Sequence, residues 1–450
     1  MSRSDVEDVA AAVLAAAKVT GADAADAVVV ESDGLEVGVR LGEPEKLCRA
    51  RERRVGLRVF MGNSVAIVSS ADLSRAAVED LAREACALAR VTAPDPHAGL
   101  PDAGELATSV PELDLYDPAV EGLEPAEGFA LATRAERAAL DADQAVTNSE
   151  GAELSAGSAH VAYASSAGFL GAYRSSFFHL SVVPVATRNG EMERDSWHTA
   201  ARHLDQLDDP ESVGLEAARR AVRRLGARQI PTGTYPVVFD PPTASSLLRH
   251  LAGAIAGPSL YRRTSFLLDR LGEPVTSPIV TIVDDPLRVA GPASRPFDGE
   301  GVTSRTQTIV RDGTLQSYLL DSYSGRRLGR ATTGHATRAV GDAPSVAPTN
   351  LHLLAGPVTP ESIVNSVDRG LYVTELIGFG VNLVTGDYSR GAVGLYIEGG
   401  EIAHAVHEVT IAGNLRQILT GIDRVGNDLD PRRATSAPTL RVQGLTVAGS

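Results

Sequence analysis

The densest group of side chains able to do chemistry lies near the end of this 450-residue chain, in VTGDYSRGAVGLYIEGGEIAHAVHE, residues 384–408. Its first polar residues fall between two apolar runs; they are Thr385, Asp387, Tyr388, Ser389 and Arg390. Hydroxyls, a carboxylate and a guanidinium this close together can hydrogen-bond a ligand at the rim of a site. Asp387 and Arg390 can instead form a structural salt bridge, which is the commoner arrangement. The stretch does not predict a phosphate loop, because G-x-x-x-x-G-K-[ST] and its lysine are absent.

The same stretch ends in H-x-x-H-E, whose spacing raises the question of a metal site at His404 and His407. The glycine pair and the flanking β-branched residues favour a strand hairpin. Because side chains alternate between the two faces of a strand, residues three apart point to opposite faces. Unless the strand bulges, the two imidazoles cannot share a metal ion, and we predict no metal here.

A second candidate is the apolar helix predicted over residues 244–256, ASSLLRHLAGAIA, with Thr243 as its expected cap. A zinc-peptidase helix needs two histidines and a glutamate on one face, so that the metal-bound water and its base lie together. This helix has one histidine, His250, and no glutamate. We therefore expect His250 to be a solvated or an interface histidine.

The remaining motifs are weaker evidence for a metal site or a catalytic site. His198 and His203 could approach each other on a helix, but their spacing fixes no carboxylate and no third ligand. FDGEG, residues 297–301, places two carboxylates around a turn, and an Asx-type turn is a commoner use of this pattern than an acid–base pair. The nucleophile motif G-x-S-x-G does not occur. None of these motifs predicts a catalytic site.

The composition limits the partners. The formal net charge is −15 without a basic stripe, which argues against nucleic acid as a ligand. The two cysteines, Cys48 and Cys86, are too few for a disulfide framework, and Cys86 falls on the apolar stripe of a predicted helix, where we expect a buried thiol. The N-terminal residues lack the features of a signal peptide, and no apolar run approaches ~18 residues. We therefore expect a cytoplasmic protein that does not enter a membrane.

The helices and strands predicted around these candidate site residues make up an α+β fold. An N-terminal α+β domain, residues 1–226, is expected to pack helices on an antiparallel sheet, with a proline-rich connection at about 91–125. A C-terminal domain, residues 227–450, is expected to be predominantly antiparallel β with few helices, and almost wholly β from Pro278 onward.

Some local features are also predicted. DAVVVES, residues 26–32, and GLEVGVRL, residues 34–41, are expected to be separate strands. Hairpin turns are expected at Asp312-Gly313 and Gly399-Gly400. The helix predicted from Pro210 to Leu225 should bury Leu215, among others.

Long, ordered stretches of the chain resemble the PmbA/TldD family, and specifically its PmbA (TldE) branch. The matching stretches include GEMERDSWHTAARHLDQL, TIVDDP, RPFDGEGV, GTLQSYLLDSYSGRRLG, TTGHATR, PTNLHL, GNDL, GLTVAG and residues 370–415. The resemblance begins at about residue 25 and is strongest from 278 to the C-terminus. It is far more specific than any single motif above.

The resemblance implies a heterodimer in which a TldD-like partner carries zinc on an H-E-x-x-x-H helix and this chain binds no cofactor. The pair would degrade or trim unfolded peptides, as in the maturation of ribosomal peptide antibiotics and the turnover of antitoxins. The degenerate positions of the metal helix are Arg249, His250 and Ala254, and no cysteine follows Cys86 to supply a thiolate. We expect a non-catalytic subunit that forms part of a closed chamber, with residues 385–390 contacting the substrate channel or the interface.

Two alternatives stay open. The chain could be an autonomous metallopeptidase or amidase of the same family, which zinc content and activity without a partner would reveal. It could instead be a non-enzymatic interaction protein, as the older family label, modulator of DNA gyrase, suggests. A homodimer is also open when the partner is absent. The natural substrate and the cleavage specificity do not follow from the residues.

Overall fold

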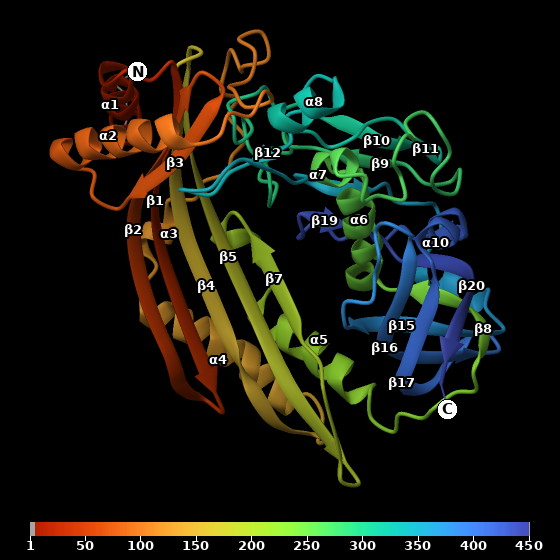
Figure 1. Ribbon diagram of the computed structural model, residues 1–450. Helices are drawn as coiled ribbons and strands as arrows, with labels where there is room; N and C mark the ends of the chain where they lie inside the picture. The colour runs from red at the N-terminus through yellow and green to blue at the C-terminus, as the bar shows by residue number, and fades with distance from the viewer. Residues whose placement is uncertain (1–4, 450) are drawn as a thin grey trace.

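A computed structural model, which describes residues 5–449, shows two bodies packed side by side (Figure 1). The first is built on a seven-stranded antiparallel sheet in the order β3-β2-β1-β4-β5-β6, with β7 also paired to β5. Its strands are β1 (Ala24–Arg40), β2 (Glu43–Met61), β3 (Ser64–Ser70), β4 (Val146–Ser165), β5 (Phe169–Arg188), β6 (Glu191–Arg194) and β7 (Trp197–Ala201). Four of them have 17 to 20 residues. The sheet is thus unusually long along its strands, because ~5–6 residues is usual.

Side chains alternate across these strands, so the two faces of the sheet differ. On β1, two groups of apolar residues on one face are buried under helices; they are Ala25, Ala27 and Val29, and Leu35, Val37 and Val39. Glu31 and Asp33, which lie between the two groups on the same face, are only partly buried. Helices α1 and α2 cover one end of this face, and α4 and α5 cover the other (Figure 1). The helices of this body are α1 (Asp5–Thr20), α2 (Arg75–Val91), α3 (Ala119–Gly122), α4 (Pro125–Asp141), the 3-10 helix η1 (Leu204–Gln206) and α5 (Pro210–Val222).

The second body contains a mixed six-stranded sheet in the order β17-β16-β15-β8-β20-β18. A further pairing of β17 with β20 closes five of these strands into a barrel. A five-stranded sheet, β11-β10-β9-β14-β19, and the pair β12-β13 lie beside it. The strands are β8 (Gly233–Phe239), β9 (Ile282–Asp284), β10 (Gln307–Arg311), β11 (Thr314–Leu315), β12 (Ala336–Thr337), β13 (Ser345–Val346), β14 (Leu351–Leu353), β15 (Arg369–Ile377), β16 (Asp387–Glu398), β17 (Glu401–Asn414), β18 (Ile422–Val425), β19 (Thr435–Ser436) and β20 (Leu440–Ala448).

One long helix, α6, crosses the core of this body, and its apolar side is buried from Ala244 to Ile255. The helices are α6 (Pro241–Ile255), α7 (Gly257–Tyr261), α8 (Ser322–Leu328), α9 (Pro360–Asn365) and α10 (Leu415–Thr420). The α+β prediction is confirmed. The expectation of almost pure β structure after Pro278 was wrong, because α8, α9 and α10 are short helices between strands.

The structure tests the predicted turns, the predicted helix cap and the predicted strand break. The turns at Asp312-Gly313 and Gly399-Gly400 are confirmed, with positive φ at all four residues. The cap of α6 is Asp240, whose carboxylate accepts from the backbone N–H of Thr243, so Thr243 lies inside the first turn. The two strands expected before residue 41 are one strand, β1, because Asp33 and Gly34 pair on both sides without a turn.

The side chains of Cys86 and Leu215 test the predicted helix faces. Cys86 is buried, as expected. Leu215 is 52% exposed, so the prediction that it is buried was wrong. The buried side of α5 runs instead through Val213, Ala217 and Ala218, which pack with α4.

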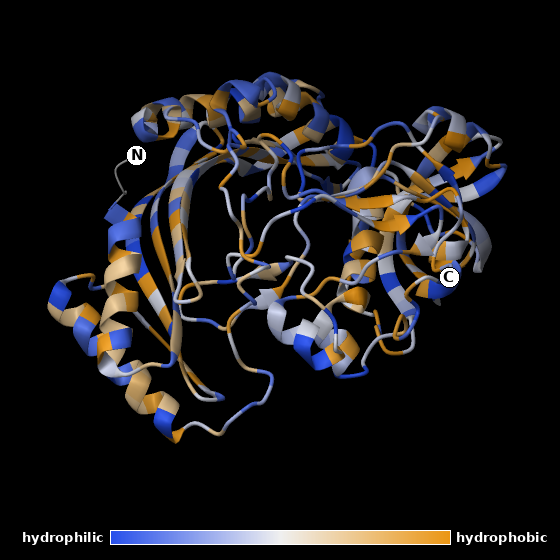
Figure 2. Ribbon diagram, turned by 90° about the horizontal axis from the view of Figure 1, so that it is seen from above, coloured by the Kyte–Doolittle hydropathy of each residue, from blue (hydrophilic) through white to orange (hydrophobic). Residues whose placement is uncertain are grey.

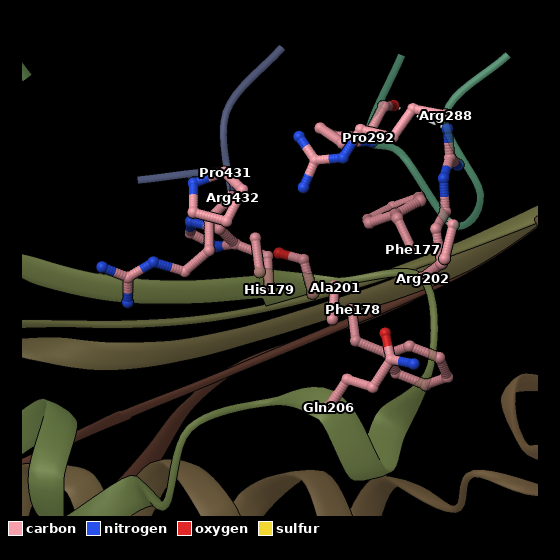
Figure 3. A pocket seen from close by; sticks show the side chains of 13 residues that line it. Phe177, Phe178, His179, Ala201, Arg202, Gln206, Arg288, Pro292, Pro431 and Arg432 are labelled. Carbon is pink, nitrogen blue, oxygen red and sulfur yellow. Dashed lines mark hydrogen bonds between the residues drawn. The ribbon is translucent and has the colours of Figure 1, made fainter. Parts of the chain in front are cut away.

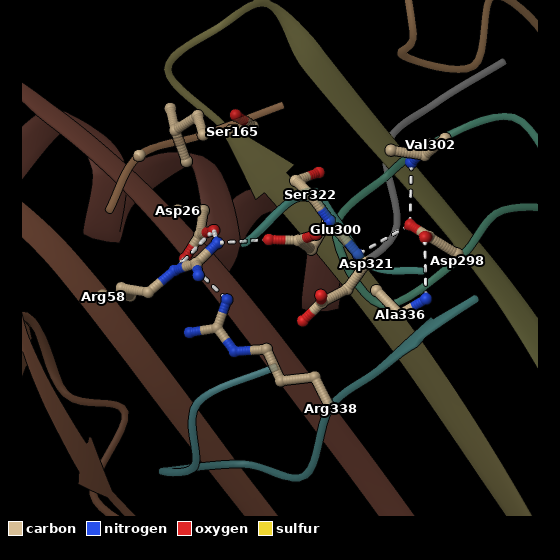
Figure 4. Close-up of polar contacts among 12 residues, drawn as sticks. Asp26, Arg58, Ser165, Asp298, Glu300, Val302, Asp321, Ser322, Ala336 and Arg338 are labelled. Carbon is tan, nitrogen blue, oxygen red and sulfur yellow. Dashed lines mark hydrogen bonds and ion pairs between the residues drawn. The ribbon is translucent and has the colours of Figure 1, made fainter. Parts of the chain in front are cut away.

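The sheet face opposite the helices meets the second body, and connecting loops cross between them (Figure 2). Phe169 of β5 packs edge-on against Phe297, with ring centroids 4.9 Å apart. Beside it, Asp26 of β1 and Arg58 of β2 form a buried ion-pair network with Glu300 and Arg338 (Figure 4). The two bodies are therefore joined by both apolar and charged contacts.

Candidate functional site

The two segments singled out by sequence, the middle of α6 and the start of β16, lie against each other. The rings of His250 and Tyr388 make an edge-to-face contact with centroids 6.1 Å apart. Tyr388 is a buried residue of β16, and its neighbour Arg390 is half-buried. The loop before β16 also approaches α6, where Leu383 lies over Gly253. The fold thus brings together residues about 140 positions apart, a separation at which sequence spacing predicts no contact.

Positive charge dominates this contact. Burial, together with the charges of Arg390 and Arg249, lowers the pKa of His250 to about 4. Burial raises the pKa of the Tyr388 hydroxyl to about 12 against the opposing charge of Arg390. His250 Nε2 is buried without a hydrogen-bond partner, so the expectation of a solvated histidine does not hold for this atom.

The salt bridge considered between Asp387 and Arg390 does not form. Asp387 accepts hydrogen bonds from the Thr385 hydroxyl at 2.6 Å and from the Asn414 amide at 3.4 Å. Arg390 donates instead to the carbonyl of Leu376 at 2.9 Å. Asp387 and Ser389 are exposed on the same face of β16, where another molecule can reach them.

The donor set on α6 does not suit a zinc ion. Zinc takes neutral imidazoles and anionic thiolates or carboxylates. Here the one imidazole, His250, has guanidinium groups beside it, and Ala254 offers no ligand atom. Across residues 5–449, no group of three or more His, Cys, Asp and Glu side chains is arranged to hold a metal.

The late histidines have separate partners. The ring of His404 stacks on Tyr396 with centroids 5.3 Å apart, whereas His407 Nδ1 lies 3.8 Å from the Glu408 carboxylate. Strand β17 does bulge, because His407 and Glu408 together face one residue of β16, and Glu408 has a φ of 56°. The bulge turns Glu408, rather than His404, toward His407.

The FDGEG segment forms the expected Asx-type turn. The Asp298 carboxylate accepts from the backbone N–H groups of Glu300 and Val302, and its second oxygen accepts from Ala336 (Figure 4). Burial and the neighbouring Glu300 carboxyl nevertheless raise the pKa of Asp298 to about 7. Glu300 is held differently, by Arg58 and the backbone N–H of Ser322. The turn serves to anchor the network between the two bodies.

A cavity of about 580 Å³ opens between the sheet face and the second body. Figure 3 shows Phe177 and Arg202 at one end and His179, Pro431 and Arg432 at the other. The cavity is closed by two loops of the second body, one of which carries Arg288. The sequence predictions missed this site because its residues come from five separate stretches of chain.

A smaller hollow of about 370 Å³ adjoins it and includes His198, Trp197 and Arg433. The stacked rings of His179 and His198, with centroids 5.3 Å apart, lie between the two spaces. His198 is on β7, whereas His203 follows it and lies 3.1 Å from the carbonyl of Asp114. The two histidines considered as neighbours on a helix are therefore apart.

The two-body α+β fold with a cleft over a long sheet defines the structural class of this protein. Models of a known protein family match the sequence of both bodies. The PmbA/TldA metallopeptidase domain 1, central domain and C-terminal domain match residues 25–89, 118–225 and 232–449. This chain belongs to the PmbA/TldD family of metallopeptidases. Metalloprotease PmbA of Escherichia coli O157:H7 is 40% identical to it over 427 residues, which cover 95% of this chain and 92% of that protein.

Solved structures agree with this assignment. A Bacteroides thetaiotaomicron protein named as a modulator of DNA gyrase is 25% identical, with a TM-score of 0.92 and 100% of each chain covered. TldE from Thermococcus kodakarensis shares the fold, with a TM-score of 0.88 at 20% identity, over 98% of this chain and 100% of that one. The family resemblance stated above is thereby confirmed. Within residues 5–449, no helix is both long enough and apolar enough to cross a membrane.

Proposed function

We propose that this chain is the metal-free partner subunit of a TldD/TldE-type zinc metallopeptidase that trims or degrades unfolded peptides in the cytoplasm. It forms part of the wall of a closed proteolytic chamber, and the zinc belongs to the TldD-like partner. Membership of the PmbA/TldD family and the close relation to a metalloprotease PmbA support a role in peptide hydrolysis.

The observation that carries the proposal is the charge around His250. A zinc ion brought to this helix would meet the guanidinium groups of Arg249 and Arg390, whose charges already act on His250, and like charges repel. Burial, helped by these cations, keeps the imidazole neutral, and the cations supply no anionic ligand. The helix therefore serves better as a wall than as a metal centre.

The loop between β15 and β16 supports a contact with a second subunit. Its exposed apolar side chains are Phe379 and Val384, and Ile377 at the end of β15 is exposed beside them. Thr385, Asp387 and Ser389 add exposed polar side chains. Exposed aromatic and aliphatic side chains grouped with a polar rim are typical of protein interfaces. We assign this loop, residues 378–386, to the subunit interface, and a second copy of this chain could occupy it when the partner is absent.

Strand β7 supports a path for an extended peptide. In the described chain it pairs only with β5, and its residues Ala200 and Ala201 line the larger cavity. An extended peptide can add to such an edge through main-chain hydrogen bonds, which tolerate varied side chains. This would suit a chamber that accepts unfolded peptides of many sequences.

Co-expression tests the proposal. The chain should co-purify with a family member that carries H-E-x-x-x-H, in a complex of fixed stoichiometry. Substitution of the two histidines in that partner should abolish peptide hydrolysis, whereas His250→Ala in this chain should leave the zinc content unchanged. Failure to bind any such partner, or loss of zinc with His250→Ala, would contradict the proposal.

A further inference from the structure

Arginines without carboxylate partners gather along the cleft. Across the described residues, no acidic side chain lies within ion-pair distance of Arg249, Arg288, Arg390 or Arg433. On the outer surface, by contrast, Arg134 has two acidic partners and Arg194 has one. Arg202 at the end of the large cavity donates only to backbone carbonyls. Within the described residues, these groups therefore form no direct ion pair, although Asp430 and Asp240 lie near enough to Arg433 to act on its charge.

These arginines form a continuous row. Arg288 and Arg432 both line the larger cavity, and Arg433, next in the chain, lines the smaller one. Burial lowers the pKa of Arg249 most, and the charges of Arg433 and Arg390 lower it further. Both arginines therefore lie near Arg249. The row therefore runs from the cavity over the sheet to the contact between α6 and β16.

Buried hydrogen-bond donors at the α6 end lack partners. They are His250 Nε2, the Tyr388 hydroxyl, Arg390 Nε and Arg433 Nε. Tyr388 is only 1% exposed, so its hydroxyl cannot be explained as a surface group. Buried polar groups in native proteins almost always have a partner, so several orphans at one place indicate a missing ligand.

We infer that this row of arginines binds the carboxylates of an acidic, extended peptide. Guanidinium groups suit carboxylates because their planar donors bind two oxygens at once. A peptide fits better than a nucleic acid, because Phe177, Pro292 and Pro431 add an apolar lining and β7 offers a strand edge. Arg432 is paired with Asp208 and Asp430, but the other arginines of the row have no such pair in the part of the chain that the structure describes. In a chain of net charge −15, these unpaired cations also select acidic segments from neutral ones. That this peptide is a substrate rests on the proposed function, but its binding does not.

Trp197 provides a local signal. It is the one tryptophan in the sequence, it lines the smaller cavity, and its ring lies 5.1 Å from the Arg432 guanidinium carbon. Its fluorescence in the purified full-length chain should change when an eight-residue glutamate-rich peptide is added. The peptide with every glutamate replaced by glutamine should bind at least about tenfold more weakly. The same peptide with an amidated C-terminus shows whether the chain binds the side-chain carboxylates or the terminal carboxylate.

Three variants complete the test. Arg288→Gln and Arg249→Gln should each weaken binding of the acidic peptide, and raised salt should do the same. Arg137→Gln removes the same charge from an exposed pair on α4 and should leave binding unchanged. Equal affinity for the acidic and neutral peptides, equal effects of all three variants, or tighter binding of an oligonucleotide would overturn the inference. Because binding is measured without a partner subunit, its failure is distinct from a failure of the proposed heterodimer.

Discussion

The guanidinium of Arg338 lies 2.6 Å from the carboxylate of Asp26, although 312 positions separate them in the chain. Both side chains are almost fully buried, and Tyr163 and Arg58 also hydrogen-bond to Asp26. Burial alone would raise the pKa of Asp26, but the charges and hydrogen bonds of Arg338 and Arg58 outweigh it, and the pKa is lowered. This pair therefore joins the two bodies as ions.

Removing one partner should be costly. Arg338→Ala leaves the Asp26 carboxylate buried with one cation fewer, and we expect the free energy of unfolding to fall by about 3–5 kcal/mol. Urea denaturation followed by circular dichroism measures this change. Arg137→Ala, in an exposed pair, is the matched control and should cost less than about 1 kcal/mol. Similar small losses for both variants would show that the buried pair does not hold the bodies together.

The raised pKa of Asp298 predicts a pH dependence. Its folded-state value of about 7 lies above its ordinary value of 3.8, so the folded chain binds this proton more tightly. The contribution of this group is fully present below about pH 4 and is lost as the pH rises through about 7. Urea denaturation between pH 5 and pH 8 should show stability falling, and Asp298→Asn should flatten that slope. An equal slope in the variant would assign it to other groups.

The crossing of α4 and α5 predicts an unusual glycine requirement. A Cβ added at Gly214 would collide with the backbone carbonyl of Ala135. We expect Gly214→Ala to destabilise the chain by about 1–3 kcal/mol, although alanine favours a helix. Leu215→Ala, at the exposed neighbour, should change stability by no more than about 0.5 kcal/mol. Thermal unfolding of the two variants compares them directly, and a stabilised Gly214→Ala would contradict the packing described.

The loop at Phe379 predicts where a partner binds. Phe379 is fully exposed, so Phe379→Ser should leave the unfolding free energy unchanged. It should weaken binding of the TldD-like subunit by about tenfold or more, because buried aromatic residues dominate interface energetics. Surface plasmon resonance with the two purified chains measures the affinity. Val19→Ser, at an exposed apolar residue of α1, is the control, and equal affinities for both variants would place the interface elsewhere.

The sequence predicted local features better than long-range ones. The hairpin turns and the apolar side of α6 follow from turn residues and spacing, and the structure contains both. The strand break expected at Asp33 was wrong, because an aspartate followed by a glycine signals a turn locally. Here its neighbours β2 and β4 extend past it and keep the strand continuous.

The candidate sites were also predicted only in their local parts. Residues 385–390 and His250 could be recognised separately, but only the fold shows that Tyr388 and His250 touch. The cleft was not predictable from the sequence. Phe177, Arg288 and Arg432 are far apart in the chain and line one cavity only in the folded protein, where loops of the second body lie over the sheet. The charged network of Asp26 and Arg58 left a faint signal, since each is a single charge within a short run of apolar residues, 24–30 and 55–61.

The most direct measurement compares zinc content and peptide hydrolysis for this chain alone and with a TldD-like partner. Elemental analysis of the purified chain should find far less than one zinc per molecule, because α6 has one imidazole beside two guanidinium groups. Hydrolysis of an unfolded peptide should occur only with the partner present. One zinc per chain together with full hydrolysis by the chain alone would contradict the account.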